Sequence, residues 1–431
     1  MIQKYLDMQC NRVGGLESQT PFGSVGHNRS SVHKWDIASD QRPSPYAAAM
    51  TPSLPTELLK AIFRYATYAG VDPSSPAVTG AKTDWFAKFE GGNLETMETK
   101  IALTRVSRRF RQIALEFLFE FVSIDKPSQA VKLAALMKKQ SSNTGLGPGK
   151  WIMFLFVRCP ESNTRLITKI LHFCRDLRGF SWNPTTSRTR LRNGETAQDE
   201  MIQNIPINIR FLHWNTPLDQ TNTFAAFLHK ASASLQILYI GGILRYPTSQ
   251  WPHLHVSYPS LTHLQVEDTY PFQCLATWTM PSLIDLDLIA RYWGGSPVMF
   301  PNVGSSLRVL RFSRSFTLLA SLLAHILDDY PNLEEIYYHY FTFRRSSLWD
   351  SDARHMKMKK VVVGIAETVH MDIEAAQSSL RHNFGPISKT RFPSLDTIIV
   401  DVVSSPLIPK GTKFLMTRVS EDFLSAKISI M

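Results

Sequence analysis

Few residues of this 431-residue chain stand in a spacing that supports metal or acid–base chemistry. In the stretch WPHLHV, His253 and His255 flank one leucine, so on a strand they would share one face. Zinc sites in proteins use three or four side chains, and no third ligand accompanies this pair. We therefore interpret both as surface histidines. Asp328 and Asp329 end an apolar helical stretch without a partner motif.

The common catalytic motifs are missing from the sequence. It contains no GxSxG, GxxxxGK[ST], GxGxxG or HExxH, so we expect neither enzymatic activity nor a cofactor. The four cysteines form no CxxC pair, which argues against structural zinc and a disulfide framework: Cys10, Cys159, Cys174 and Cys274. Cys159 and Cys174 lie in apolar surroundings and are predicted to be buried, reduced thiols.

Composition and charge describe a folded chain with a basic balance. The hydrophobic fraction is 44% and the charged fraction 19%, values typical of globular proteins. No apolar run approaches the ~18 residues of a membrane span, and the first residues show no secretory signal. We expect a cytoplasmic or nuclear protein without a membrane contact.

A net charge of +11 would suit binding to nucleic acid, to an anionic membrane or to an acidic protein. Residues 101–140 carry eight Lys or Arg against three acids, and residues 344–360 carry six against two. Neither tract is dense enough to argue for nucleic acid by itself. We interpret both as solvated basic faces.

The sequence divides into four segments that differ in composition and periodicity. Residues 1–50 lack periodicity and are predicted to be disordered. Residues 51–125 hold helical patterns around a polar stretch, 71–100, that we interpret as a loop with at most a short helix. Residues 126–150 are predicted to be a helix and a linker, and residues 151–431 form the repeat domain described below.

Within residues 51–125 two amphipathic helices are expected. Thr56 is placed to cap the first, TPSLPTELLKAIFRYATYAG. The second is IALTRVSRRFRQIALEFLFEF, in which apolar residues share one face and arginines occupy the others. We expect it to be one continuous helix.

From residue 152 the pattern apolar-x-x-apolar-x-apolar recurs ten times. The copies begin at Ile152, Leu177, Ile209, Leu235, Leu261, Leu283, Leu307, Leu333, Met358 and Leu395. Most are 22 to 32 residues apart, the last gap being 37, and several follow a Pro-Ser or Pro-Asn pair. Apolar stripes at helical spacing lie between copies. A strand and a helix repeated at about 25 residues predict an α/β solenoid with a curved parallel sheet, and this period with this hexamer is the leucine-rich-repeat signature.

The hexamer also predicts which side chains face outward. Positions 1, 4 and 6 are expected in the core, and position 5 on the concave face. The fifth residues form the predicted row Ser181, His213, Tyr239, Gln265, Asp287, Arg311, Tyr337 and Ile399. Leucine-rich repeats usually carry Asn or Cys eight residues after the first Leu, which this chain lacks, so we expect an irregular array with turns closed by other means.

The block LPTELLKAIFRYA resembles the start of an F-box, and LTRVSRRFRQIA resembles its second half, with Ser107 where the family has Cys and Phe110 where it has Trp. FLFEFVSIDKPSQAVKLAALMKK is similar to the strand and helix that follow the F-box in large fungal F-box families. The long segment at 71–100 departs from the short turn of an ordinary F-box.

That resemblance implies a substrate-recognition subunit of an SCF-type ubiquitin ligase, whose F-box binds a Skp-type adaptor and, through it, a cullin. The adaptor contact would come from Leu54, Pro55, Leu58, Leu59, Ile62, Val106, Arg108, Arg109, Phe110 and Ile113. An unknown protein substrate would bind the concave face at His213, Tyr239, Gln265, Asp287, Arg311 and Tyr337. The alternative is a repeat scaffold, or a basic nucleic-acid binder, that joins no ligase.

Overall fold

The computed structural model describes fourteen stretches of the chain in two compact units, residues 1–121 and 122–431. The described residues are 54–67, 85–144, 148–185, 195–216, 221–241, 255–267, 275, 277–289, 303, 305–312, 320–341, 354–366, 390–402 and 427–430. The predicted disordered segment 1–50 lies outside them.

Unit 1 contains three described helices, α2 (Thr56–Ala66), α3 (Trp85–Val106) and α4 (Arg108–Phe119). Their apolar residues form one cluster between α2 and α4: Leu59, Phe63, Ile113, Ala114 and Phe117. Met97 and Ile101 of α3 pack with Leu118 of α4 in a second cluster. The helical spacing in the sequence therefore builds a small three-helix core.

Two details of unit 1 differ from the prediction. Part of the expected loop at 71–100 is helical: α3 begins at Trp85 and runs through the rest of that segment. The expected continuous second helix is interrupted at Ser107, whose backbone is extended and whose hydroxyl accepts a hydrogen bond from the Phe110 N–H at 3.1 Å. Such a bond satisfies a free N–H at a helix start, so Ser107 begins a new helix.

Thr56 is also placed differently from the prediction. It is the first residue of α2, after Pro55, and no side-chain capping bond is found at this helix start.

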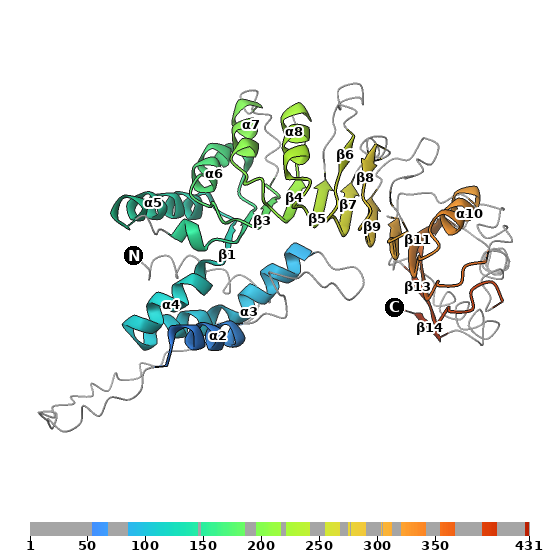
Figure 1. The fold of residues 1–431 in the computed structure, drawn as a ribbon, viewed down its shortest axis with the longest axis horizontal. Coiled ribbons are helices and arrows are strands. Elements are labelled where there is room, and N and C mark those ends of the chain that lie inside the picture. The colour runs from blue at the N-terminus through green and yellow to red at the C-terminus, as the bar shows by residue number, and fades with distance from the viewer. Residues whose placement is uncertain are drawn as a thin grey trace, which may run out of the picture. The chain divides into compact units, whose positions relative to one another are not determined.

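Unit 2 is built on a parallel sheet of twelve strands, with β1 starting at the boundary between the units (Figure 1). In sheet order the strands are β1 (Phe121–Ile124), β2 (Phe154–Val157), β3 (Gly179–Trp182), β4 (Phe211–Asn215), β5 (Ile237–Gly241), β7 (His263–Glu267), β9 (Asp285–Ile289), β10 (Val309–Phe312), β11 (Glu335–Phe341), β12 (Lys360–Ala366), β13 (Thr397–Val402) and β14 (Lys427–Ile430). Sheet order follows chain order, as in a solenoid whose units contact only their neighbours.

All ten predicted hexamers coincide with strands of this sheet. Each strand from β2 to β13, the short β6 and β8 apart, begins at the third residue of its hexamer. The first residue of every copy, from Ile152 to Leu395, is buried. The α/β repeat fold with a parallel sheet is thereby confirmed. The strands β1 and β14 carry no predicted hexamer.

Helices cover one face of the sheet, on the outside of its curve (Figure 1). They are α5 (Pro127–Thr144), α6 (Thr164–Leu171), α7 (Glu195–Gln203), α8 (Thr221–Ala231) and α10 (Ala320–Asp329), with short turns of 3-10 helix at η2 (Pro148–Trp151) and η3 (Glu161–Asn163). Between β5 and β9 the described outer layer is a two-stranded sheet, β6 (Val256–Ser257) with β8 (Trp278–Thr279). None of the helices described combines the length and apolar character needed to cross a bilayer.

The helix predicted within the segment 126–150 is α5, whereas the linker predicted there does not coincide with the boundary between the units. The boundary between the units falls at residues 121 and 122, and α5 continues to Thr144, through the first residues of the Ser- and Gly-rich stretch. Helix α5 packs on α6, so it is part of the repeat layer.

A ladder of serine and asparagine side chains closes the turns in place of the missing Asn. In six of the ten repeats, the residue before the hexamer donates a side-chain hydrogen bond to a carbonyl of the previous repeat. Ser260 donates to the Ala233 carbonyl at 3.1 Å, and Ser306 donates to the Pro281 carbonyl at 2.7 Å. The other members are Ser234, Ser282, Asn332 and Ser394. The Pro-Ser lead-ins of the sequence thus join successive repeats.

Candidate partner-binding surfaces

Four exposed apolar side chains of unit 1 belong to the predicted adaptor contact. Leu54, Leu58 and Ile62 lie one helical turn apart at the start of and along α2, and Val106 ends α3. Their exposed fractions are 49, 50, 50 and 63%. We call these four residues the docking face. Exposed apolar side chains that gather on one element, as Leu58 and Ile62 do on α2, mark interaction surfaces.

The remaining apolar residues of the predicted contact are mostly internal. Leu59 and Ile113 are buried in the core of unit 1. Phe110 is half-buried, with its ring edge-on to Phe63 at a centroid distance of 5.0 Å. Pro55 is exposed. The predicted set therefore divides into a core and a surface, as helical periodicity requires.

The two predicted arginines differ in their surroundings. Arg109 donates from Nη2 to the Leu54 carbonyl at 2.5 Å and to the Thr56 hydroxyl at 3.3 Å. It thereby holds the chain entering α2 against the start of α4. Arg108 is exposed, and no acid partner for it is found in the described part of unit 1. Sequence reasoning assigned both to a partner and missed the internal role of Arg109.

Unit 1 also contains a buried lysine that the sequence did not single out. Lys100 Nζ donates to Asn93 Oδ1 at 2.8 Å and lies 5.3 Å from the centroid of the Phe121 ring. Burial lowers the pKa of Lys100 to about 8, although the nearby Glu120 carboxylate raises it and Arg64 lowers it further. Arg64 in turn donates to both carboxylate oxygens of Glu120, at 2.8 and 2.6 Å. This network joins α2, α3 and the end of α4.

The predicted row on the concave face exists as a continuous in-register ladder. Neighbouring strands pair Ser181 with His213 and, at the other end, Arg311 with Tyr337. The order is Phe156, Ser181, His213, Tyr239, Gln265, Asp287, Arg311, Tyr337, Val362, Ile399 and Ser429. Phe156, Val362 and Ser429 are members that the predicted row omitted.

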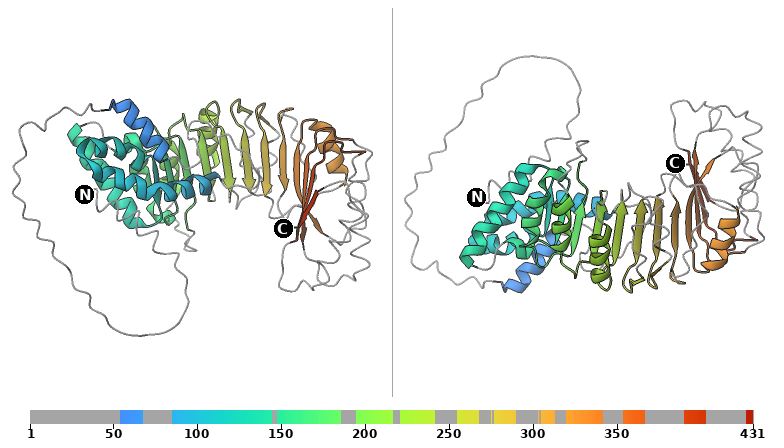
Figure 2. Two further views of the ribbon diagram at one scale, coloured as in Figure 1. Left: turned by 90° about the horizontal axis from the view of Figure 1, so that it is seen from below. Right: turned by 90° about the horizontal axis from the view of Figure 1, so that it is seen from above.

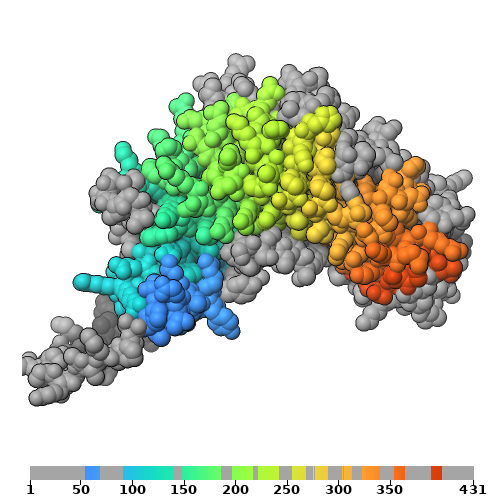
Figure 3. Space-filling view, in the orientation of Figure 1, coloured from blue at the N-terminus to red at the C-terminus, as the bar shows by residue number. Residues whose placement is uncertain are grey.

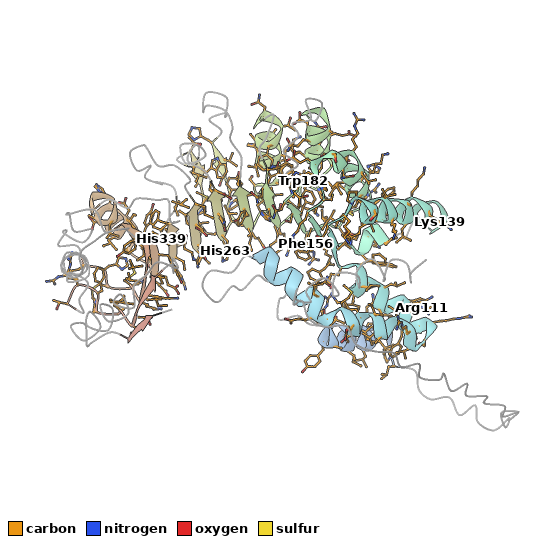
Figure 4. The ribbon with its side chains drawn as sticks, turned by 180° about the vertical axis from the view of Figure 1, so that it is seen from behind. Arg111, Lys139, Phe156, Trp182, His263 and His339 are labelled. Atoms are coloured by element: carbon orange, nitrogen blue, oxygen red, sulfur yellow. The ribbon has the colours of Figure 1, made fainter. Side chains whose placement is uncertain are left out.

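Along the hexamers, side chains on the face opposite the helix layer alternate with core residues. Figure 4 shows Trp182 on the helix side of the sheet and Phe156 and His263 on the other. At the start of the array this face is aromatic and closely packed. The Phe154 ring extends over Gly179, where a Cβ atom would lie 2.4 Å from Phe154 Cδ1. Gly179 is thus required by close approach of a neighbouring ring.

The middle of the ladder is polar and internally bonded. The Ser181 hydroxyl and His213 Nδ1 are 2.9 Å apart, and the His213 ring meets Tyr239 edge-on at 4.4 Å between centroids. Ser181 and His213 are buried, whereas Tyr239 and Gln265 are partly accessible. Because both side chains are buried and bond each other, we assign this Ser–His pair a structural role.

Arg311 is the centre of a charged cluster near the other end. It forms an ion pair with Asp285 of β9, and its guanidinium carbon lies 4.9 Å from the centroid of the Tyr337 ring. Burial alone would lower the pKa of Arg311, but the bond to Asp285 and the neighbouring acids outweigh it and raise that pKa. Tyr337 donates to Glu335 at 2.6 Å and accepts from Lys360 at 3.0 Å.

The same cluster affects two titrating groups beside it. Burial raises the pKa of the Tyr337 hydroxyl, and the hydrogen bond to Glu335 adds to that rise. Burial lowers the pKa of His263, partly offset by the Asp285 carboxylate. Both groups are therefore held neutral near pH 7. The cluster carries both signs of charge at fixed positions, which suits recognition of a polar partner.

The histidines, cysteines and acids considered as candidate ligands or catalytic residues form no further site in the described stretches. No group of three or more His, Cys, Asp or Glu there is arranged to hold a metal ion. His253 lies outside the described residues, and His255 is exposed. Cys159 and Cys174 are buried free thiols, as predicted, and burial raises their pKa values to about 11 and about 12.

Comparison with known proteins gives no family. The sequence matches no protein-family model and no curated protein. Among solved structures, a protein from Bacteroides fragilis is similar at 12% identity and a TM-score of 0.33, over 83% of this chain and 86% of that one. The Rad7 and Elc1 complex of yeast contains a chain similar at 11% identity and a TM-score of 0.33, over 83% and 91%.

Proposed function

We propose that the protein is an F-box substrate-recognition subunit of an SCF-type ubiquitin ligase. Unit 1 binds a Skp-type adaptor, and through it a cullin, while the concave face of unit 2 holds a protein substrate. Such a role places the protein in the cytoplasm or the nucleus. The observation that supports it best is the docking face, because Leu58 and Ile62 stay half-exposed on a helix whose Leu59 and Phe63 complete a core.

Two further observations fit this proposal. Ser107, at the F-box position usually held by Cys, caps α4 and so turns the chain between α3 and α4. Arg109 fixes the Leu54 carbonyl, so the Leu-Pro segment presents its side chains from a defined backbone. A preorganised apolar surface loses little conformational freedom on binding.

For the substrate, the partly accessible centre of the ladder is the best candidate, from Tyr239 through Asp287 to Arg311. Aromatic and arginine side chains are frequent anchors in protein interfaces. The charged cluster around Arg311 is rigid, since its side chains already bond one another.

Copurification of the intact protein with a Skp-type adaptor tests the adaptor contact. We expect Val106→Asp and Leu58→Asp to abolish binding, because a carboxylate would be buried in an apolar contact. Val131→Asp is the matched control, since Val131 is a similarly exposed valine (55%) on α5, in unit 2. Failure of the intact protein to bind the adaptor would refute the proposal. Steeply salt-dependent binding to RNA or DNA would instead favour the repeat scaffold as a nucleic-acid binder.

A further inference from the structure

The turns that precede the strands of unit 2 line up along the side of the sheet where the strands begin (Figure 2). We define the edge strip as three positions in each of the ten repeats: the two residues before the hexamer and the second residue of the hexamer. The outermost row consists of Lys150, Arg175, Ile207, Ala233, Pro259, Pro281, Ser305, Pro331, Met356 and Pro393, and all ten are exposed.

Hydrogen bonds between repeats make this strip rigid. Ser282 donates to the Pro259 carbonyl at 2.6 Å, and Ser394 donates to the Met356 carbonyl at 2.6 Å. Each bond ties the middle row of one repeat to the outer row of the one before. Proline also restricts the backbone at four outer positions. A partner would therefore meet a surface that needs no ordering.

The strip collects most of the exposed apolar side chains of unit 2. Of the four large ones found in its described part, Ile207, Ile284 and Met356 lie on the strip, with exposed fractions of 62, 36 and 65%. The fourth is Val131 on α5. The proline rings of the outer row extend this apolar character between them. Exposed apolar side chains arranged in a row indicate an interface with another protein segment.

The charge of the strip is positive. Its bases are Lys150, Arg175, Arg178, Arg210, Arg308, Lys357 and Lys359, and its acids are Asp176, Glu334 and Asp396. Seven bases less three acids leave a net charge of +4 over these thirty residues. Glu334 is already in contact with Arg308 and Lys359. Arg178 and Arg210, on adjacent repeats, have no acid partner among the residues described.

We propose that the edge strip is a docking surface for an acidic protein segment that carries apolar side chains. Its bases match acidic groups, while its prolines and exposed Ile207 and Met356 match apolar ones. A nucleic-acid backbone would contact the Lys and Arg side chains of the strip but would make no contact that requires its apolar row. Ten strands at ~4.8 Å span roughly 43 Å, about the length of 13 extended residues at ~3.3 Å each. The strip shares no residue with the docking face or the concave ladder, so it does not depend on the proposed ligase function.

Fluorescence anisotropy with the full-length protein tests the proposal. The probe is a labelled peptide of about 13 residues that alternates Glu and Leu, compared with a Lys–Leu peptide and an oligouridylate of similar length. The Glu–Leu peptide should bind, and the Lys–Leu peptide should not. The double variant Arg178→Glu, Arg210→Glu and the single variant Met356→Asp should each weaken binding by about tenfold or more.

Two control substitutions on α5 lie off the strip, Lys132→Glu and Val131→Asp, and both should leave the affinity unchanged. Thermal melts of all variants check that each remains folded. The proposal is overturned if the Glu–Leu peptide does not bind, or if the controls weaken binding as much as the strip variants. It is also overturned if oligouridylate binds more tightly and Met356→Asp has no effect.

Discussion

Lys100 Nζ donates a hydrogen bond of 2.8 Å to Oδ1 of Asn93, two turns earlier on α3, and both side chains are buried. A buried ammonium group is unusual in a unit with so small a core. It persists because Asn93 accepts a hydrogen bond from it and Glu120 lies close enough to favour its charge. Because Lys100 is buried in this way, we expect the stability of unit 1 to change with pH in the alkaline range.

The free energy of unfolding of unit 1 should rise between pH 8 and pH 10.5. The pKa of Lys100 is about 8 when folded against 10.5 for an ordinary lysine. In that window the unfolded chain binds a proton that the folded chain has lost, so raising the pH favours folding. The gain is at most about 3 kcal/mol. Urea unfolding at several pH values should show this rise in the native protein and its loss in Lys100→Met. Lys60→Met, at a half-exposed lysine, should keep the rise.

The serine ladder should contribute measurably to the stability of unit 2. The Ser306 hydroxyl contacts the Pro281 carbonyl at 2.7 Å and the Leu283 carbonyl at 2.9 Å. Ser306→Ala leaves these carbonyls without that donor and should cost about 1 kcal/mol. Ser257→Ala, at an exposed serine on β6, is the control and should be neutral. Equal denaturation midpoints for the two variants would show that the ladder does not stabilise the repeats.

Substituting the two glycines Gly179 and Gly91 should have opposite effects. At Gly179 an added methyl group meets the buried Phe154 ring at 2.4 Å, so Gly179→Ala should destabilise unit 2 by about 1–3 kcal/mol. At Gly91, inside α3, nothing lies within 4 Å, so Gly91→Ala should stabilise unit 1 by up to about 1 kcal/mol.

A double-mutant cycle with Phe154→Leu locates the cause at Gly179. If the Phe154 ring is the obstacle, Gly179→Ala should cost less in the Phe154→Leu background. An unchanged cost would place the strain elsewhere.

Removing Asp285 should cost more than removing a surface charge. Arg311 and Asp285 are mostly buried, with side-chain exposures of 12 and 15%, so Asp285→Ala leaves the guanidinium without its carboxylate. We expect a loss of about 2 kcal/mol, and a smaller one for Arg311→Met, which removes the charge but keeps the bulk. Lys359→Met breaks the exposed pair with Glu334 and should change stability by less than about 1 kcal/mol. Chemical denaturation of the three variants compares these costs.

The repeat domain could be predicted well because its periodicity is local. Every hexamer, from Ile152 to Leu395, became a strand at its third residue, since alternating apolar residues define a strand face wherever they occur. The apolar stripes at helical spacing between the copies formed helices such as α8 and α10 for the same kind of reason. Strand β14 escaped prediction because so short a segment carries too little pattern.

Unit 1 was predicted less well because its key contacts are distant in sequence. The pattern from Leu103 to Leu118 fits one helix, and only the side-chain bond of Ser107 shows that the chain turns there. The pairing of Arg109 with the Leu54 carbonyl spans 55 residues, and no local signal announces it. Which residues of the predicted adaptor contact are exposed was likewise visible only in the packed structure.

By itself the amino-acid sequence determined the repeat, its register and the order of side chains along the concave ladder, because strand alternation and stacking are properties of neighbouring residues. The space-filling view in Figure 3 shows these repeats following one another in chain order across unit 2. Only the tertiary structure decided which ladder members are buried, as His213 and Tyr337 are, and where charges such as Lys100 and Arg311 find partners. Burial and charge pairing depend on groups brought together from distant parts of the chain, which no single-sequence pattern encodes.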